Sequence, residues 1–276
     1  MLSLDIPDPS NKDSVADWIE LAVGYEAVPM SKAAVITKLQ TALGDEPADD
    51  FISSVWDELE NRMYLYGEHP PFVIDSMEVN PNLNWQDNPE YIMCLILALT
   101  GNPVNPTPTG KLFERISKEA IQNYIQGQAI VTGHPGQYNV QQICNLTYEL
   151  FRNELPPQYN DRGVDVIAWK SFNDQRGNQI LILMQCAGGH NWFTKTGDVK
   201  LRPWTEHYIG FHSPPVRGFS TAVVVPKSQF YNISLETDLL FDRTRIYRNV
   251  IDHQVEGTLR IEVLTWCNTR LLEILN

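Results

Sequence analysis

Several classes of protein are excluded by what the sequence lacks. It has no run of about 18 apolar residues, so we expect no transmembrane helix. The most apolar stretch, Tyr91–Thr100, is about half that length and predicts a buried helix. The amino terminus has no basic region followed by an apolar core, so we expect no secretory signal and a cytoplasmic protein.

Cysteine is scarce, with 4 residues in a chain of 276 and no C-x-x-C pair. The four cysteines lie far apart in apolar or amphipathic segments, so we expect reduced, buried thiols and no zinc site. The sequence also lacks the P-loop, G-x-G-x-x-G, G-x-S-x-G and H-E-x-x-H patterns. Nucleotide hydrolases, dinucleotide-dependent enzymes, lipases and zincins therefore have no support.

Positive charge is scarce in the first half of the chain. The net charge is −13, and residues 1–135 hold 20 acidic and 7 basic side chains, whereas residues 136–276 hold 14 of each. An acidic surface repels phosphate groups. We therefore expect the first half to contact a protein partner, and any nucleic acid to bind through the second half.

The first half has apolar residues at helical spacing, and a hairpin follows the third predicted helix. Three helices and a hairpin are typical of a winged-helix-like unit. The third helix is strongly acidic, which disfavours a role in reading a DNA major groove. The predicted helices cover 13–23, 31–43, 48–62 and 88–100, and the predicted strands cover 63–66 and 71–79.

A segment rich in proline and glycine, Gly101–Gly110, predicts an irregular linker. We place a domain boundary there, with an acidic, mainly helical domain over 1–104 and an α/β domain over 105–276. The order of elements in the second domain predicts a mixed sheet flanked by helices. Its predicted helices cover 111–125, 140–153, 199–210 and 259–275, and its predicted strands cover 163–169, 179–187 and 219–226.

Two polar side chains on neighbouring predicted strands form a candidate site. Asp165 stands among apolar residues, where a carboxylate is costly unless a cation or hydrogen-bond donors meet it; a solvated strand edge is the alternative. A turn over 173–178 lies midway between Asp165 and Gln185 in the sequence, so it would place Gln185 beside Asp165 on the next strand. Their oxygens suit a hard cation such as Mg²⁺. Glu114 is the first choice for a third, helical ligand, and Glu149 is the second.

These residues resemble the motifs of the restriction-endonuclease-like PD-(D/E)xK nuclease superfamily, in particular its Mrr-like branch with a Q-x-K third motif. The resemblance spans roughly 105–226 and rests on Phe113-Glu114, Gly163-Val-Asp-Val166 and Gln185-Cys186. It implies that Glu114, Asp165 and Gln185 hold Mg²⁺ or Mn²⁺. It also implies cleavage of phosphodiester bonds in DNA or RNA, within a microbial defence or restriction-type complex.

The chain departs from this family at the motif lysine, because Ala187 stands two positions after Gln185. The candidates to replace it are His190, Lys195 and Lys170. His190 is closest in sequence, and a histidine can act as a general base near neutral pH. Without a replacement, the chain would be a catalytically inactive nuclease-fold subunit with a structural or interaction role.

A rival chemistry uses Cys186 as a nucleophile with a histidine base (His190, His207 or His212), although a mid-strand cysteine is usually inert. Other side chains near the predicted site could hold a nucleic-acid backbone or stack on its bases. A separate basic cluster could meet phosphates or form surface ion pairs. The first group is Arg162, Lys170, Arg176, Lys195, Lys200, Arg202, Trp192 and Trp204, and the second is Arg243, Arg245 and Arg248.

Overall fold

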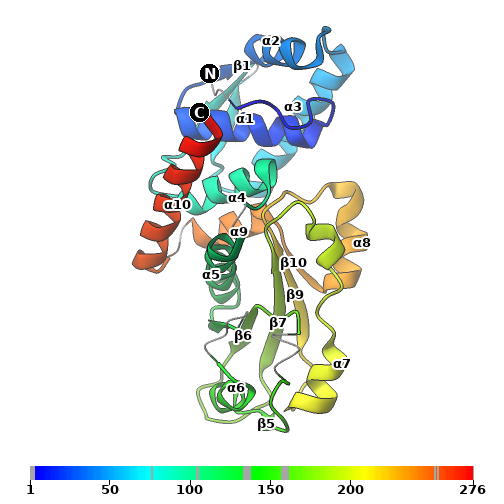
Figure 1. The fold of residues 1–276 in the computed structure, drawn as a ribbon, viewed down its shortest axis with the longest axis vertical. Coiled ribbons are helices and arrows are strands. Elements are labelled where there is room, and N and C mark those ends of the chain that lie inside the picture. The colour runs from blue at the N-terminus through cyan, green and yellow to red at the C-terminus, as the bar shows by residue number, and fades with distance from the viewer. Residues whose placement is uncertain are drawn as a thin grey trace.

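A computed structural model of the chain describes residues 4–75, 77–103, 106–132, 138–156, 162–251, 253 and 255–275. Helices from the start of the chain lie at one end of the molecule and a twisted sheet fills the other (Figure 1). Within the described residues, no helix combines the length and the apolar character needed to cross a membrane.

Three helices and a small antiparallel sheet form the amino-terminal part, and its winged-helix-like character stays a prediction. The strands are ordered β1-β3-β2, and β1 is a short strand that the sequence did not predict. Ser31 caps the second helix through its side chain, as expected. The elements are α1 (Lys12–Glu26), β1 (Met30–Ser31), α2 (Lys32–Leu43), α3 (Asp49–Tyr66), β2 (Phe72–Asp75) and β3 (Glu78–Pro81).

The strand predicted over 63–66 is wrong, because these residues form the last turn of α3. Leu59, Arg62 and Tyr66 are all buried and recur at helical spacing, so the buried face of the helix continues to its end. A short apolar run does not by itself distinguish a helix end from a strand. The hairpin lies entirely within β2 and β3.

A mixed sheet of five strands, flanked by helices, forms the larger part of the molecule, as the sequence predicted. Its order is β10-β9-β7-β6-β4. β6 runs antiparallel to both β4 and β7, while β7, β9 and β10 run parallel to one another. The strands are β4 (Gln128–Val131), β6 (Val166–Lys170), β7 (Ile180–Ala187), β9 (Val216–Thr221) and β10 (Leu239–Phe241).

Helices cover both faces of this sheet. The long helix α5 packs on β4, β6 and β7, whereas α8 packs on β9 and β10 and η2 contacts β7. A small pair, β5 with β8, lies at the far end of the molecule (Figure 1). The remaining bounds are α5 (Pro106–Ile125), α6 (Val140–Thr147), β5 (Leu150–Phe151), η2 (Trp192–Lys195), α7 (Leu201–Pro203), η3 (Trp204–Tyr208), β8 (Ile209–Gly210) and α8 (Lys227–Thr237).

Several predicted boundaries were wrong. The predicted linker extends into a helix, because α5 begins at Pro106; proline is tolerated in a first helical turn, where its missing N–H has no partner to lose. The helix predicted over 140–153 stops at Thr147, where Tyr148 takes a left-handed conformation. The helix predicted over 199–210 is replaced by α7, η3 and β8. The sequence also did not predict β4, α8, β10 or the helix α9 (Arg243–Val250).

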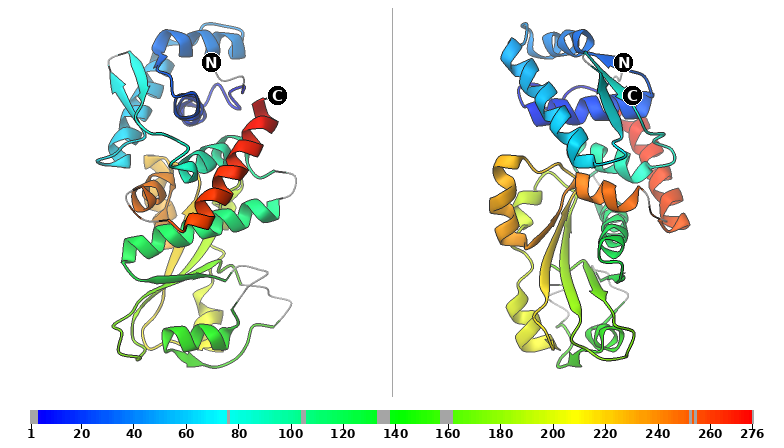
Figure 2. Two further views of the ribbon diagram at one scale, coloured as in Figure 1. Left: turned by 90° about the vertical axis from the view of Figure 1, so that its left-hand side faces the viewer. Right: turned by 180° about the vertical axis from the view of Figure 1, so that it is seen from behind.

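The two last helices return to the amino-terminal part. α4 (Pro89–Thr100), which matches its prediction, contacts both α1 and α10 (Gly257–Leu275), and α9 (Arg243–Val250) contacts α3, α4 and α5. Figure 2 shows α10 running from the level of α5 back toward the amino-terminal helices. The predicted division at residue 104 stays a prediction, but side chains from both sides of it share one apolar core.

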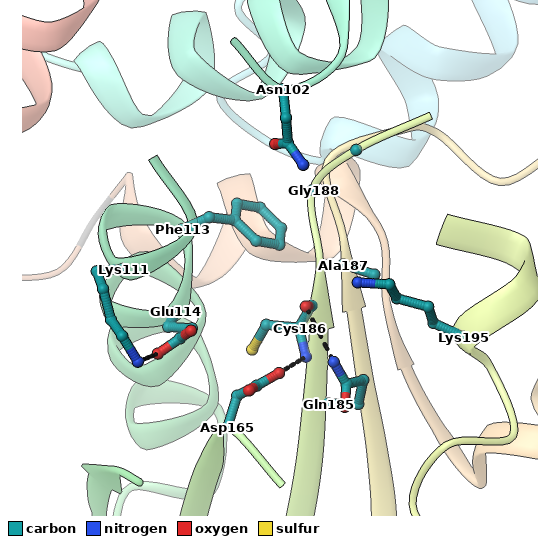
Figure 3. Close-up of a pocket in the computed structure, with 12 residues that line it drawn as sticks. Asn102, Lys111, Phe113, Glu114, Asp165, Gln185, Cys186, Ala187, Gly188 and Lys195 are labelled. Carbon is teal, nitrogen blue, oxygen red and sulfur yellow. Dashed lines mark hydrogen bonds and ion pairs between the residues drawn. The ribbon is translucent and has the colours of Figure 1, made fainter. Parts of the chain in front are cut away.

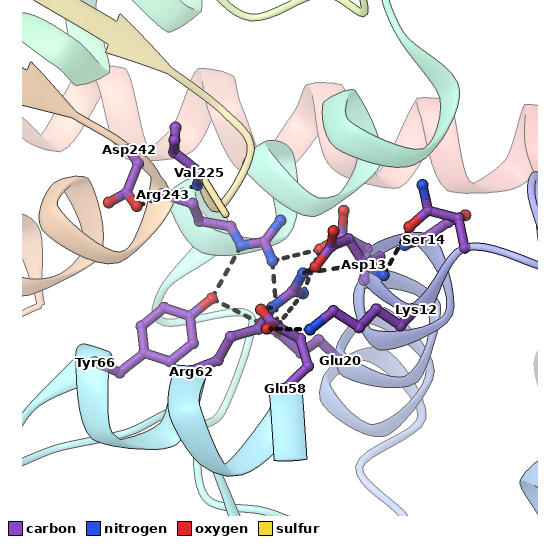
Figure 4. Close-up of polar contacts among 12 residues, drawn as sticks. Lys12, Asp13, Ser14, Glu20, Glu58, Arg62, Tyr66, Val225, Asp242 and Arg243 are labelled. Atoms are coloured by element: carbon purple, nitrogen blue, oxygen red, sulfur yellow. Dashed lines mark hydrogen bonds and ion pairs between the residues drawn. The ribbon is translucent and has the colours of Figure 1, made fainter. Parts of the chain in front are cut away.

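A buried ion network joins α9 to the amino-terminal helices (Figure 4). Arg62 and Arg243 are each 1% exposed, and each places a guanidinium nitrogen 2.6 Å from Asp17 Oδ1. Both also contact Glu20, and Arg243 Nε donates to the Tyr66 hydroxyl at 2.9 Å. Arg243 is therefore neither a surface ion-pairing residue nor a phosphate contact, which corrects the expectation from sequence.

Candidate active site at the end of strand β7

The turn over 173–178 pairs β6 with β7 as the sequence predicted. The register matches Val166 with Met184 and Lys170 with Ile180. One step further along the same register, Asp165 lies opposite Gln185. The Asp165 backbone N–H donates to the Met184 carbonyl at 2.9 Å, so the pairing extends to the candidate site.

Asp165 and Gln185 meet at the same residue of β7. The Asp165 Oδ2 atom accepts a hydrogen bond from the Cys186 backbone N–H at 2.7 Å, and Gln185 Nε2 donates to the Cys186 carbonyl at 3.3 Å. Asp165 is 8% exposed and Gln185 is 7% exposed. The backbone of β7 therefore orients the carboxylate. Figure 3 shows Asp165 on the α5 side of β7 and Gln185 on the opposite side of the strand, toward Lys195.

Glu114 reaches the same pocket from α5. Lys111, one helical turn earlier, donates to Glu114 Oε2 at 2.9 Å. Figure 3 shows Glu114 and Asp165 on the α5 side of β7. The cavity is about 330 Å³ and is lined by Asn102, Gly110, Lys111, Phe113, Glu114, Asp165, Gln185, Cys186, Ala187, Gly188, Gly189 and Lys195. The three predicted metal ligands, Glu114, Asp165 and Gln185, thus all line one cavity, with Glu114 and Asp165 on one side of β7 and Gln185 on the other.

Of the three candidates for the missing lysine, the structure brings Lys195 to the pocket. Its side chain extends from η2 toward Ala187 (Figure 3). His190 is exposed and does not line the cavity; its ring packs beside Gly101. Lys170 is at the opposite end of β6, where its ammonium group donates to the Gln126 carbonyl. Lys195 therefore lines the cavity and His190 does not, and the catalytic role predicted for His190 stays a prediction.

The amino-terminal part of the chain supplies one wall of the pocket. Gly188 and Gly189 follow β7, and a Cβ atom on Gly189 would lie 2.7 Å from Asn102 Nδ2. A Cβ atom on Gly188 would lie 3.1 Å from Leu97 Cδ1. The paired glycines therefore allow close contact with the end of α4. Sequence reasoning missed Asn102 and Lys111, although the Gly-Gly pair was a signal of close backbone approach.

Glu149, the second choice for a helical ligand, lies outside this pocket. Its carboxylate accepts hydrogen bonds from the backbone N–H groups of His212 at 2.7 Å and Asn178 at 3.2 Å. The same carboxylate contacts His212 Nδ1 at 2.7 Å. Glu149 therefore connects α6, the turn before β7 and the segment after β8.

The geometry disfavours Cys186 as a nucleophile. Burial raises the pKa of its thiol well above the ordinary value, and the negative charges of Asp165 and Glu114 raise it further. The thiolate is the nucleophilic form of cysteine, so this thiol is poorly reactive near neutral pH. Among the described residues that line the pocket there is no histidine, and none of His190, His207 and His212 lies there to pair with Cys186.

Most of the predicted nucleic-acid contacts have partners within the protein. Trp192 and Trp204 are buried, so they serve the core and are not platforms for stacking bases. The Arg162 guanidinium donates to the Tyr208 hydroxyl at 2.9 Å. Two further arginines of this group form ion pairs: Arg176 with Asp174, and Arg202 with Glu206.

The donor set in the pocket suits a hard divalent cation. Glu114 and Asp165 offer carboxylate oxygens and Gln185 offers an amide oxygen, which are ligands that Mg²⁺ accepts together with water. Among the residues that the structure describes, no group of three His, Cys, Asp or Glu side chains is placed to hold a metal ion. A cation here would therefore depend on Gln185 and on oxygens from water or substrate.

No protein-family model and no curated protein sequence matches the chain. Among solved structures, restriction endonuclease FokI gives a TM-score of 0.30 at 10% sequence identity, over 86% of this chain and 44% of the FokI chain. The chain thus spans less than half of that protein's length. At this TM-score the likeness adds nothing to what the pocket itself shows.

Proposed function

We propose that the chain is a metal-dependent nuclease that cleaves phosphodiester bonds of DNA or RNA. The observation that supports this proposal is the convergence of Glu114, Asp165, Gln185 and Lys195 in one cavity at the end of β7. These residues come from a helix, two adjacent strands and the short helix η2, and they supply both oxygen donors and a cation.

Glu114, Asp165 and Gln185 are the residues that would hold Mg²⁺ or Mn²⁺. A divalent cation bound at such a site lowers the pKa of a bound water and offsets negative charge on a phosphate. The protein fixes the ligands before substrate arrives, because Lys111 holds Glu114 and the Cys186 N–H holds Asp165. Such preorganisation is what a hydrolytic site needs.

Lys195 performs the role that the motif lysine has in the resembling family. Its ammonium group can donate hydrogen bonds to a phosphate oxygen or to the attacking water, and its charge attracts the substrate backbone. Ala187 cannot be replaced by a lysine without repacking, because it is buried against Phe219 and Trp192. In this proposal the lysine is therefore Lys195 of η2 and not a residue of β7.

The proposal extends to the setting in which the enzyme works. Nucleic acid would bind through the part of the chain after residue 104, and the acidic amino-terminal part would contact a basic protein partner that supplies targeting. This matches an effector subunit of a microbial defence or restriction-type complex in the cytoplasm.

The test compares wild-type protein with variants of the pocket, using DNA and RNA substrates with Mg²⁺ or Mn²⁺. We expect Asp165→Asn, Glu114→Gln and Lys195→Met each to lower the cleavage rate by about 100-fold or more. Glu236→Gln, an exposed acid on α8, is the matched control and should keep full activity. Cleavage at the wild-type rate by Asp165→Asn would refute the proposed site.

The second candidate function is a catalytically inactive nuclease-fold subunit, and the alanine at position 187 is the observation that favours it. That candidate predicts no metal-dependent cleavage of either nucleic acid by the wild-type chain, with or without its partner. It also predicts that calorimetric titration with Mn²⁺ gives the same result for wild type and Asp165→Asn.

A further inference from the structure

A second cavity, of about 610 Å³, lies at the β10 edge of the sheet. Residues of α5, α8, β10 and α9, with Asp238 between α8 and β10, line it. Small-molecule sites typically have volumes of about 300–1,000 Å³, so the cavity is large enough for a ligand the size of a nucleotide. It shares no lining residue with the candidate active site.

Two arginines of α9 give this cavity positive charge. Arg245 and Arg248 are three residues apart, so they project from the same side of the helix. The Arg245 guanidinium is held in place, because it donates to the Leu240 carbonyl at 2.7 Å and lies 4.8 Å from the centre of the Phe230 ring. In the part of the chain that the structure describes, neither arginine forms an ion pair.

The acid in the lining does not cancel this charge. The Asp238 carboxylate accepts three hydrogen bonds from Arg217: from Nη2 at 2.7 Å, from Nε at 3.1 Å and from the backbone N–H at 3.1 Å. Asp238 and Arg217 therefore neutralise each other, and Arg245 and Arg248 leave the cavity positive. A positive cavity in a chain of net charge −13 is a local exception that favours an anionic ligand.

An exposed aromatic ring stands beside the two arginines. Tyr124, near the end of α5, is 54% exposed, and its ring packs edge-on against Phe241 with 5.4 Å between the ring centres. This contact holds the Tyr124 ring in place while leaving much of it open. Aromatic rings and guanidinium planes are the surfaces on which nucleic-acid bases stack, and guanidinium groups bind phosphate.

We infer that this cavity binds a nucleotide, with the base against Tyr124 and the phosphate held by Arg245 and Arg248. The nucleotide can come from two sources, a free mononucleotide or one unit of a bound single strand. Tyr124 is ten residues from Glu114 on the same helix, which separates the two sites by about 15 Å along its axis. The inference does not depend on catalysis, so it stands or fails independently of the proposed nuclease.

The test measures binding by calorimetry with the full chain and no divalent metal, so that no cleavage occurs. The probes are the adenosine and uridine 5′-monophosphates, a short single-stranded oligonucleotide and inorganic phosphate. We expect a saturable site for at least one of the nucleotide probes. Arg248→Gln should weaken it about tenfold, because one charged phosphate contact is lost. Tyr124→Ala should weaken the binding of nucleotides but leave the binding of inorganic phosphate unchanged.

Arg152→Gln is the matched control, because Arg152 is an exposed arginine just after β5, at the far end of the molecule; this variant should bind the probes as wild type does. Binding of the mononucleotides would identify the ligand as a free nucleotide. Binding of the oligonucleotide alone would identify it as part of a single strand. Either result supports the site if Arg248→Gln weakens that binding. Three results overturn the inference: no saturable binding below about 1 mM, equal binding by Arg248→Gln and wild type, or phosphate binding as tightly as nucleotides.

Discussion

Arg243 Nη2 lies 2.6 Å from Asp17 Oδ1, so a residue of α9 is ion-paired with a residue of α1 that precedes it by 226 positions. Both side chains are buried, and Arg62 binds the same Asp17 oxygen from α3. Buried charges are stable only when they are paired and hydrogen-bonded. The contact therefore fixes the start of the chain to its carboxyl-terminal helices.

Replacing Arg243 by methionine should destabilise the protein by about 3–5 kcal/mol, because Asp17 and Glu20 would lose a buried cationic partner. Urea unfolding followed by circular dichroism measures the change. Arg202→Met, at an exposed position, should change the free energy of unfolding by less than about 0.5 kcal/mol. Equal stability of the two variants would show that the network is not needed.

The same network predicts a dependence of stability on pH. Burial alone would raise the pKa of the Asp17 carboxyl, but Arg243 and Arg62 outweigh it, and the pKa lies below its ordinary value. A carboxyl with a lowered pKa stabilises the fold above the pKa of the unfolded chain, about 3.9, and loses this contribution as the pH falls through the folded value.

We therefore expect the wild type to lose stability as the pH falls below about 4, and Asp17→Asn, although less stable at neutral pH, to lose less over the same range. The pKa of neighbouring Asp13 is raised by burial and acts in the opposite sense, but both proteins keep it. Urea unfolding from pH 6 to pH 2 gives the comparison, and parallel curves for the two proteins would contradict it.

Gly163 has a φ of +75° just before β6, and a Cβ atom there would lie 2.9 Å from the Asp198 carbonyl oxygen and 3.2 Å from Gln185 Oε1. Gly44, with a φ of +82°, has no atom within 4 Å of the same position. Gly44→Ala should cost about 1–2 kcal/mol from backbone strain alone. Gly163→Ala should cost about 1–3 kcal/mol more, and should also lower activity by displacing Gln185. Equal losses in urea unfolding would show that the space around Gly163 is not tight.

Glu149→Ala should loosen the end of the sheet distant from the candidate active site. Its carboxylate accepts from the backbone N–H groups of both His212 and Asn178 and contacts the His212 ring. Hydrogen bonds to a charged group contribute about 1.5–3 kcal/mol, so the loss of these contacts should destabilise this end of the sheet. Hydrogen exchange should quicken around Asn178 and His212 but not around β9. Unchanged exchange at both residues would count against this role.

The thiols should react slowly in the folded protein. Burial raises the pKa of Cys94 to about 12 and that of Cys144 to about 11, and it raises those of Cys186 and Cys267 well above the ordinary value. A thiol reagent at pH 8 should therefore modify the folded chain much more slowly than the urea-unfolded chain. Fast modification of Cys186 alone, located by peptide mass spectrometry, would revive the cysteine chemistry. Cys186→Ser should keep any nuclease activity.

The sequence was most informative where local signals agreed with burial. The cap at Ser31 placed α2, and the turn midway between Asp165 and Gln185 placed the hairpin, because both depend on residues close together in sequence. The partners of Arg243 could not be predicted in this way, because its charge gives no indication of burial and Asp17 is distant in sequence.

Which of the three candidates for the motif lysine lines the pocket could not be predicted from the sequence either. His190 is closer to Gln185 along the chain, but the turn after Gly189 carries it toward Gly101, while η2 returns Lys195 to the pocket. The direction of that loop depends on contacts with α4, from another part of the chain. Distance along the chain was therefore a poor guide to which side chain completes the pocket.

α10 packs against both α4 and α5, so it links the amino-terminal helices to the helix that covers the sheet. We therefore expect these two parts to stay associated without an intact peptide bond near residue 103. After cleavage of the backbone there, the contacts of α10 and the buried ion pairs of Arg243 should still hold the two fragments together. The two halves, expressed separately, should recognise each other and reassemble, as in fragment complementation.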